Sequence, residues 1–374
     1  MSKKSIQSSH RPKRRKLPVH GVLILDKPKG LSSNQAMSRV RWLAEAAKAG
    51  HTGALDPMAT GVLPICFGEA TKFSQRMLDA DKSYDATIRL GATTDTYDAE
   101  GELLSYHNPS ELCDSQIKSE LLTMQGAQSQ VPPVYSALKH NGKPLYHYMR
   151  GTKKRQSLEE QSQNIPKLSP AEIEGLLEKK RRDVFIHQCD LLRLVHVRDS
   201  GHKTYIDLDV RIRCSKGTYI RSIAHDLGAR LGVGGHLTAL RRTRAAGFSI
   251  EQSIALEKVE RVGESDSSRI KDLLMPVDCL LRDLPFVELS LAQSKLFTQG
   301  GVNVIEGLQS EGGEPFDLSE LQLQEVRVYA IKPKIDAASA DTAGTLIGLG
   351  EVRRIRVGSN NYSLELHPKR IVLS

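Results

Sequence analysis

The segment Gly50–Gly61, which reads GHTGALDPMATG, combines the residue types of a reactive loop. Its three glycines permit backbone angles and close approaches that a Cβ would block, so a ligand can lie against the main chain. Asp56 is the only ionisable carboxylate in it, and Pro57 keeps Asp56 out of a helix interior. We interpret the segment as an active-site loop built around Asp56. The alternative is a polar turn in which Asp56 hydrogen-bonds its own backbone and His51 lies at the surface.

Three other places in the sequence could support chemistry on an anionic or aromatic ligand. Tyr84 opens a strand of alternating residues predicted at 84–90, either as a core tyrosine or as a ring against which a base stacks. Arg221 falls in the first turn of a predicted helix, where the dipole disfavours a cation, so we expect a carboxylate nearby. The cationic stretch 240–244, headed by Leu240, is also compatible with a solvated basic edge.

The elements that must position these residues have the pattern of an α+β protein. Apolar runs and alternation predict strands at 21–25, 62–67, 84–90, 184–193 and 204–213. Helical spacing predicts helices from residue 32 or 33 to about 49, over 68–79 and 111–125, and after residue 217. The Asn141-Gly142 pair predicts a hairpin. From about residue 283 onward, short strands with glycine turns predict a small β-barrel, with strands at 326–331, 345–349, 353–357 and 362–366.

Charge points to an anionic partner. The 374 residues include 53 Lys and Arg against 44 Asp and Glu, a formal net charge of +9, which favours binding of an anionic molecule. Residues 1–19 begin with a cluster of Lys and Arg and no acidic residue, so we expect a disordered basic arm that contacts phosphate. A polar, charged insertion at about 152–182 could clamp RNA or be a solvated excursion.

The cysteines and the hydropathy of the sequence indicate the cellular compartment and the cofactors that we expect. The five cysteines are odd in number and widely spaced without a CxxC pair, so we expect neither a disulfide framework nor a structural zinc. We find no Walker A pattern and no GxGxxG after a strand, so no nucleotide cofactor is implied. The sequence contains no secretory or membrane-spanning run, so we expect a cytoplasmic protein. A monomer is the default expectation.

Five blocks in fixed order carry a family resemblance that is more specific than any lone glycine pattern. They cover about residues 20–250 and resemble the TruB family of tRNA pseudouridine synthases. The loop block reads GHTGALDPMATGVLPICFGEATK, and the others are GVLILDKPKGLSSN from Gly21, KSYDATIRLGATTDTYDAEG from Lys82, VPPVYSALKHNGKPLY from Val131 and CSKGTYIRSIAHDLG from Cys214.

The resemblance implies a fold, a reaction and a substrate. The fold is a mixed, largely antiparallel sheet in a pseudouridine synthase catalytic domain over 20–282, followed by a PUA-like RNA-binding barrel over 283–374. The reaction is the isomerisation of uridine 55 in the tRNA T-loop to pseudouridine. A tRNA pseudouridine-55 synthase flips the base out of the RNA and needs no metal or other cofactor, because one carboxylate suffices as the covalent or electrostatic partner.

The resemblance also assigns roles to six residues. Asp56 is the catalytic carboxylate, Arg221 pairs with it and holds it ionised, and Tyr84 stacks on the flipped uracil and helps to remove the C5 proton. The pocket wall is completed by Tyr219 and Leu240, and the space left by the extruded nucleotide is filled by His51.

Two other classes of protein remain open on the residues alone. A pure RNA-binding or RNA-folding protein would explain the charge but would leave Asp56, Arg221 and Tyr84 without a purpose. A cofactor-free nucleoside hydrolase would use Asp56 and release free base. Product analysis distinguishes the three classes, because they yield isomerised RNA, unchanged RNA or liberated uracil.

Overall fold

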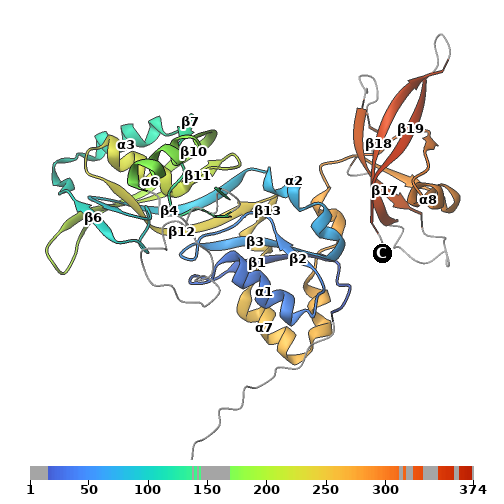
Figure 1. The fold of residues 1–374 in the computed structure, drawn as a ribbon, viewed down its shortest axis with the longest axis horizontal. Helices are drawn as coiled ribbons and strands as arrows, with labels where there is room; N and C mark the ends of the chain where they lie inside the picture. Colours follow the sequence, from blue (N-terminus) through green and yellow to red (C-terminus); the bar gives the residue numbers. More distant parts are fainter. Residues whose placement is uncertain are drawn as a thin grey trace, which may run out of the picture.

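The computed structural model describes most of the chain (Figure 1). The described residues are 16–136, 139–140, 143–144, 169–310, 315–316, 323–331, 344–357 and 362–372. None of the helices in these ranges is long and apolar enough to cross a membrane.

Ten of the described strands form one sheet. They are β1 (Gly21–Lys27), β2 (Ala49–His51), β3 (Thr60–Phe67), β4 (Lys82–Leu90), β7 (Gly126–Gln130), β10 (Arg182–Arg198), β11 (Thr204–Cys214), β12 (Gly235–Ala245), β13 (Phe248–Ser249) and β14 (Ile254–Ala255). The order is β14-β1-β3-β12-β4-β11-β10-β7, with β13 beside β12 and β2 beside β3. Neighbours are antiparallel except β1 with β14 and β12 with β3. The sheet is therefore mixed and largely antiparallel, as the sequence predicted.

The alternation along β4 gives this strand one buried face and one polar face. Tyr84, Ala86 and Ile88 are buried in the main apolar core, because successive side chains of a strand point to opposite faces. The residues between them lie on the other, polar face, where Asp85 pairs with Arg211 of β11 across 2.8 Å. One strand thus presents an aromatic ring to the protein interior and charges to solvent.

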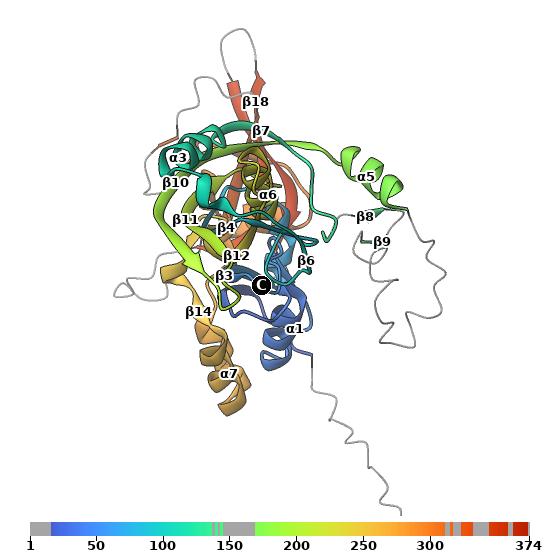
Figure 2. The same cartoon turned by 90° about the vertical axis from the view of Figure 1, so that its left-hand side faces the viewer.

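Helices cover the apolar face of the sheet. Side chains of α1 (Ser33–Leu43), α3 (Asp114–Thr123), α6 (Ile220–Arg230) and α7 (Leu256–Ser265) pack into the same core as the strands. Figure 2 shows α1 beside α7 at one end of the sheet and α6 beside α3 at the other. The other short elements before residue 283 are α2 (Ser74–Leu78), α5 (Pro170–Glu178), β5 (Ala92–Thr94), β6 (Leu103–Tyr106), β8 (Lys139–His140), β9 (Lys143–Pro144), η1 (Gly68–Lys72), η2 (Pro109–Glu111), η4 (Ile250–Gln252), η5 (Ser267–Leu273) and η6 (Val277–Leu280).

The helix predicted to run from residue 32 or 33 to 49 is shorter than expected. It begins where predicted, because the Ser32 hydroxyl accepts a hydrogen bond from the Gln35 amide as a capping residue. It ends at Leu43 rather than near Gly50. Glu45 has a φ of 50°, and its carbonyl oxygen accepts a hydrogen bond from the Leu17 amide at 2.8 Å. Tertiary hydrogen bonding therefore overrides helix propensity after the first three turns.

Several sequence-predicted segments lie at the edge of the described residues. Of the basic arm at 1–19, residues 1–15 are outside the described part, whereas Val19 is already buried in the core. Of the insertion at about 152–182, residues 152–168 are outside it, and the rest forms α5 and the start of β10. The predicted hairpin is present as the pair β8 and β9, although its Asn141-Gly142 turn is not among the described residues.

The C-terminal region forms a second, curled sheet. Its five strands are β15 (Phe286–Leu289), β16 (Asn303–Ile305), β17 (Leu323–Ala330), β18 (Thr345–Arg356) and β19 (Tyr362–Ile371), in the order β15-β17-β18-β19-β16. They pack with Phe297 of α8 (Leu291–Thr298), a helix that the sequence analysis did not predict, into a core of their own. The strands predicted at 345–349 and 353–357 are one continuous strand.

The two sheets share an apolar seam. The far face of β1 and β3 is covered by residues of η6, by Leu349 of β18 and by Val372, which directly follows β19. Polar contacts flank the seam, including the Lys72 Nζ donating to the Ile371 carbonyl at 2.9 Å and Arg76 paired with Asp283 at 2.7 Å. Figure 1 shows the C-terminal sheet beside this end of the larger sheet.

Gly61 allows the sheet to close beside the Asp56 loop. Strands β3 and β12 pair at two positions, Thr60 with Arg241 and Gly61 with Arg242. Gly61 has a φ of 105°, and a Cβ on it would lie 2.2 Å from the Arg242 carbonyl oxygen. Only glycine satisfies both the backbone angle and the contact.

We expect Gly61→Ala to destabilise the protein severely and Gly126→Ala to do so mildly. Both glycines have a positive φ, but a Cβ on Gly126 would meet no atom within 4 Å. Backbone strain alone costs about 1–3 kcal/mol, whereas strain with a backbone clash should exceed about 4 kcal/mol. Urea unfolding of the two variants measures the difference. Equal losses of unfolding free energy would show that the contact with Arg242 does not restrict this position.

Candidate active site

The loop around Asp56 connects β2 to β3 and is tied to two other elements. The buried Ser33 hydroxyl at the start of α1 accepts from the Leu55 amide at 2.7 Å and donates to the Leu55 carbonyl at 3.1 Å. The Gly30 amide donates to the Pro57 carbonyl at 2.8 Å. These bonds fix the backbone on both sides of Asp56 and so restrict the direction of its side chain. Such a fixed carboxylate fits the interpretation of the segment as an active-site loop.

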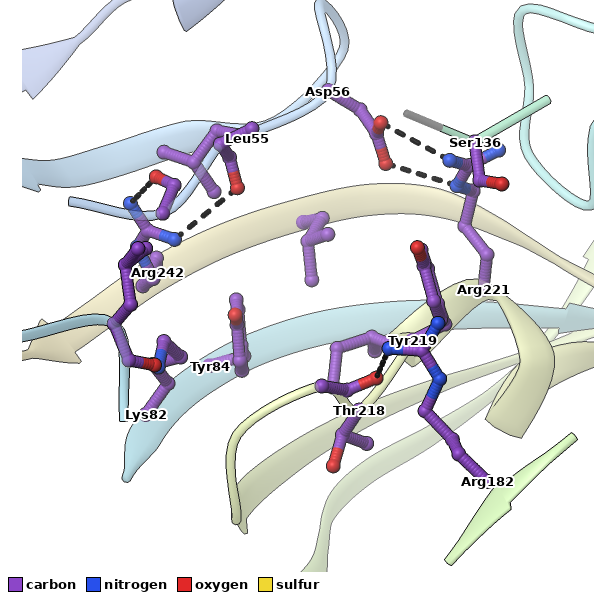
Figure 3. Close-up of a pocket in the computed structure, with 16 residues that line it drawn as sticks. Leu55, Asp56, Lys82, Tyr84, Ser136, Arg182, Thr218, Tyr219, Arg221 and Arg242 are labelled. Atoms are coloured by element: carbon purple, nitrogen blue, oxygen red, sulfur yellow. Dashed lines mark hydrogen bonds and ion pairs between the residues drawn. The ribbon is translucent and has the colours of Figure 1, made fainter. Parts of the chain in front are cut away.

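Arg221 holds the Asp56 carboxylate in a two-point contact (Figure 3). Its Nη2 donates to Asp56 Oδ1 at 3.1 Å, and its Nε lies 2.9 Å from Asp56 Oδ2. The same guanidinium donates to the Thr96 carbonyl at 3.0 Å and to the Tyr135 carbonyl at 2.9 Å. The Arg221 side chain is only 4% exposed. The sequence-based expectation of a carboxylate near this helix start is confirmed, because Asp56 occupies that position.

A second carboxylate, Asp98, faces Arg221 from the loop after β5. Its Oδ2 lies 3.6 Å from the Arg221 Nε, and its Oδ1 accepts from the Thr96 hydroxyl and the Glu100 amide. Sequence analysis assigned no role to Asp98. Its burial could not be read from local pattern, because it depends on a loop that folds onto α6.

The neighbouring Tyr97 fixes that loop. It has a φ of 62°, uncommon for a residue with a side chain, and its ring stacks on the ring of His225 with centroids 3.9 Å apart. His225 stands one helical turn after Arg221 on α6. The same helix therefore positions the arginine and the loop that carries Asp98.

Burial and pairing act on Asp56 in opposite directions. Desolvation raises the pKa of Asp56, and the Arg221 guanidinium lowers it. Asp98 adds to the upward pKa shift, since a second negative charge nearby disfavours ionisation. The net effect is a raised pKa for Asp56, and Arg221 is the group that most opposes this rise and favours the ionised form.

A cavity of about 270 Å³ lies beside the Asp56–Arg221 pair. It is lined by Tyr84 from β4, Leu240 from β12 and Tyr219, the residue before α6. These three predicted site residues thus line the same cavity as Asp56 and Arg221. His51 is not among the lining residues: it lies on β2, opposite Ile65, with a half-buried ring.

Cations that bind carbonyl oxygens occupy the Tyr84 side of the cavity. Arg242, 1% exposed, donates to the carbonyls of Val62 at 2.7 Å and Gly53 at 3.0 Å, and Lys82 donates to the Leu78 carbonyl at 2.9 Å. Both line the cavity. The alternative of a solvated basic edge at 240–244 is therefore wrong for Arg242, because β12 is a central strand and carries this side chain into the interior.

Burial perturbs several groups around the cavity. It lowers the pKa of Lys27, which donates to the Leu31 carbonyl at 2.6 Å, to about 8, while the charge of Asp56 acts in the opposite direction. It raises the pKa of the Tyr84 phenol, with Arg242 opposing the rise. Tyr84 lines the cavity and Lys27 lies close enough to Asp56 to feel its charge, and perturbed pKa values around a cavity are typical of an active site.

The arrangement supplies a carboxylate, an arginine that orients it and favours its ionised form, and an aromatic ring, all lining one cavity. This set can act on an electrophilic carbon of a ligand whose flat part lies against Tyr84. The surrounding cations would attract a ligand that carries phosphates.

Comparison with solved structures gives the fold class. The chain is similar to a chain in an H/ACA ribonucleoprotein bound to a substrate RNA containing 2′-deoxyuridine, with a TM-score of 0.58, 19% identity, and coverage of 95% of this chain and 86% of that one. A Cbf5-Nop10-Gar1 complex gives a TM-score of 0.58 at 20% identity, covering 98% and 91%. At this identity the likeness concerns the fold alone.

Sequence comparison gives the family. Residues 41–176 match the model of the TruB family pseudouridylate synthase N-terminal domain, and residues 221–282 match that of the tRNA pseudouridylate synthase B C-terminal domain. These matches define a pseudouridine synthase, an isomerase.

Proteins with similar sequences match this chain over most of its length. A tRNA pseudouridine synthase B of Ralstonia pickettii is 41% identical over 93% of this chain and 95% of its own. One of Aromatoleum aromaticum is 48% identical over 76% and 81%. The chain therefore belongs to the TruB family.

We expect Arg221→Lys to lower turnover and to shift its pH dependence. Lysine keeps the charge but loses the planar fork that reaches Asp56, Thr96 and Tyr135. With weaker pairing, burial raises the pKa of Asp56 further, so the ionised form is reached only at higher pH.

Turnover near pH 7 should fall about 100-fold, and the acid limb of the kcat profile should move upward in pH. Arg211→Lys, on the exposed face of the sheet, is the matched control. If Arg221→Lys lowers turnover but leaves the acid limb of the kcat profile at the same pH, pairing with Arg221 is not what favours ionisation of Asp56.

Proposed function

We propose that this TruB-family enzyme isomerises uridine 55 in the T-loop of tRNA to pseudouridine, with Asp56 as the catalytic carboxylate. The observation that carries the proposal is the contact of Asp56 with the buried Arg221 at the wall of a cavity that Tyr84 also lines. The names of the relatives from Ralstonia pickettii and Aromatoleum aromaticum support tRNA as the substrate. Position 55 rests on the resemblance of the sequence blocks.

The reaction exchanges one bond of the nucleotide for another. The N1–C1′ bond breaks, uracil turns within the cavity, a C5–C1′ bond forms, the proton on C5 leaves, and N1 takes up a proton. Atoms and electrons balance without an oxidant or an energy source. Asp56 promotes the cleavage as a nucleophile or as an electrostatic partner, which requires its ionised form. Arg221 maintains that form and aims the carboxylate.

The other cavity residues hold the flipped base. In this proposal Tyr84 stacks on the uracil and helps to remove the C5 proton, and Tyr219 and Leu240 complete the wall. A base in a loop costs less to extrude than a paired one, which suits a T-loop uridine. His51, which lies outside the cavity lining, would support the RNA where the nucleotide has left the stack.

RNA outside the cavity would contact basic surfaces. We propose that residues 283–374 act as a PUA-like RNA-binding domain after a catalytic domain over 20–282. The far end of β18 supports this role, because Arg353 is half exposed and the Arg354 guanidinium lies 4.0 Å from the Tyr362 ring centroid. Residues 1–19 and the insertion would add phosphate contacts, which are salt-sensitive. We take the active form to be a monomer.

The decisive test is tritium release from a tRNA transcript that carries 5-³H-uridine, with purified protein and no added cofactor. The wild-type protein should release tritium and leave the RNA chain intact. Asp56→Asn should abolish release while retaining tRNA affinity, because the amide cannot act as a carboxylate but keeps the shape of the site. Mapping of the product should place the pseudouridine at position 55.

Asp85→Asn is the matched control for this test. Asp85 neighbours Tyr84 on the same strand but lies on the opposite face, paired with Arg211, and exposed pairs contribute little to stability. It should keep turnover close to that of the wild type. Free uracil would indicate a hydrolase, and substantial turnover by Asp56→Asn would refute the role of the carboxylate.

A further inference from the structure

Ser136 carries a buried hydroxyl that no described residue satisfies. The residue is 3% exposed, and its Oγ has no hydrogen-bond partner within the described part of the chain. A hydroxyl taken out of water without a partner is costly, and buried hydroxyls in proteins are nearly always paired. This one therefore needs an explanation.

The place of Ser136 supplies that explanation. It lines the same cavity as Asp56, Tyr84 and Arg221, and Figure 3 shows it beside the Asp56–Arg221 pair. It follows Tyr135, whose carbonyl accepts from the Arg221 Nη2 at 2.9 Å, and its own amide donates to the Val134 carbonyl at 3.0 Å. The backbone beside Ser136 is thus held to Arg221.

We propose that the Ser136 hydroxyl is a substrate contact that hydrogen-bonds the target nucleotide inside the cavity. The inference rests on the proposed function, since it takes the occupant of the cavity to be a uridine. A hydroxyl both donates and accepts, so it can pair with a carbonyl or N–H of the uracil edge or with the ribose 2′-hydroxyl. Sequence analysis assigned no role to this residue.

The proposal predicts opposite effects on stability and activity. In the free enzyme Ser136→Ala removes an unpaired buried hydroxyl, so the Tm should stay the same or rise. In the complex the same change leaves a polar atom of the nucleotide unpaired, so kcat/KM for tritium release should fall about tenfold or more. If Ser136 had only a structural role, its loss would not lower kcat/KM while the Tm stays the same or rises.

Two further variants control the experiment. Ser222→Ala is the matched case of a satisfied hydroxyl, because Ser222 is 1% exposed and donates to the Val131 carbonyl at 2.9 Å; its Tm should fall. Ser136→Cys nearly preserves the side-chain volume but bonds weakly. It should show the same loss of activity as Ser136→Ala. If Ser136→Ala has a lowered Tm, the activity of Ser136→Cys tests the substrate contact instead.

Affinity for a tRNA with 2′-deoxyuridine at the target position assigns the bonded atom. If Ser136→Ala weakens binding of both the normal and the deoxy tRNA, the partner is the base; if it weakens only the normal one, the partner is the 2′-hydroxyl. Rates and affinities of both Ser136 variants within about twofold of the wild type would overturn the proposal. A wild-type protein that releases no tritium would instead overturn the proposed function.

Discussion

The site depends on the burial of one guanidinium. Arg221 contacts three segments that are distant in the sequence: the Asp56 loop, the loop that carries Thr96 and Asp98, and the carbonyl of Tyr135. A buried arginine cannot lose its proton and must be surrounded by acceptors. The segments that supply those acceptors are thereby fixed relative to one another. The contacts that satisfy the charge of Arg221 are therefore the same contacts that assemble the cavity.

The two sides of the cavity differ in how their charges are satisfied. On one side, Arg221 faces two carboxylates, so its charge is neutralised by side chains. On the other, Arg242 and Lys82 donate to carbonyl oxygens, which satisfy hydrogen bonds without cancelling charge. The Tyr84 side of the cavity therefore stays electropositive. An RNA phosphate or electron-rich base approaching there would meet an attractive potential that is only weakly screened, because the cations are buried.

Local pattern in the sequence was enough to predict the α+β class, the start of α6 and the strands β1, β3, β4, β10 and β11, because alternation and glycine turns act over a few residues. The family-specific blocks identified Asp56, Arg221 and Tyr84, and the fold brings all three to one cavity. What could not be predicted depends on contacts between distant segments. The early end of α1 results from a hydrogen bond to Leu17, and the burial of Arg242 results from the central place of β12. Asp98 is hidden by a loop whose conformation depends on His225.

The apolar seam between the two sheets has a consequence for substrate selection. Leu349 and Val372 share a cluster with Val22 and Ile24 of β1, so neither sheet can separate without exposing apolar surface to water. The cavity and the exposed end of β18 are then held at a fixed distance from each other. Under the proposed function, an RNA bound at both places would have to present its uridine at that distance from the C-terminal contact, and overall shape, rather than base sequence, would select the target.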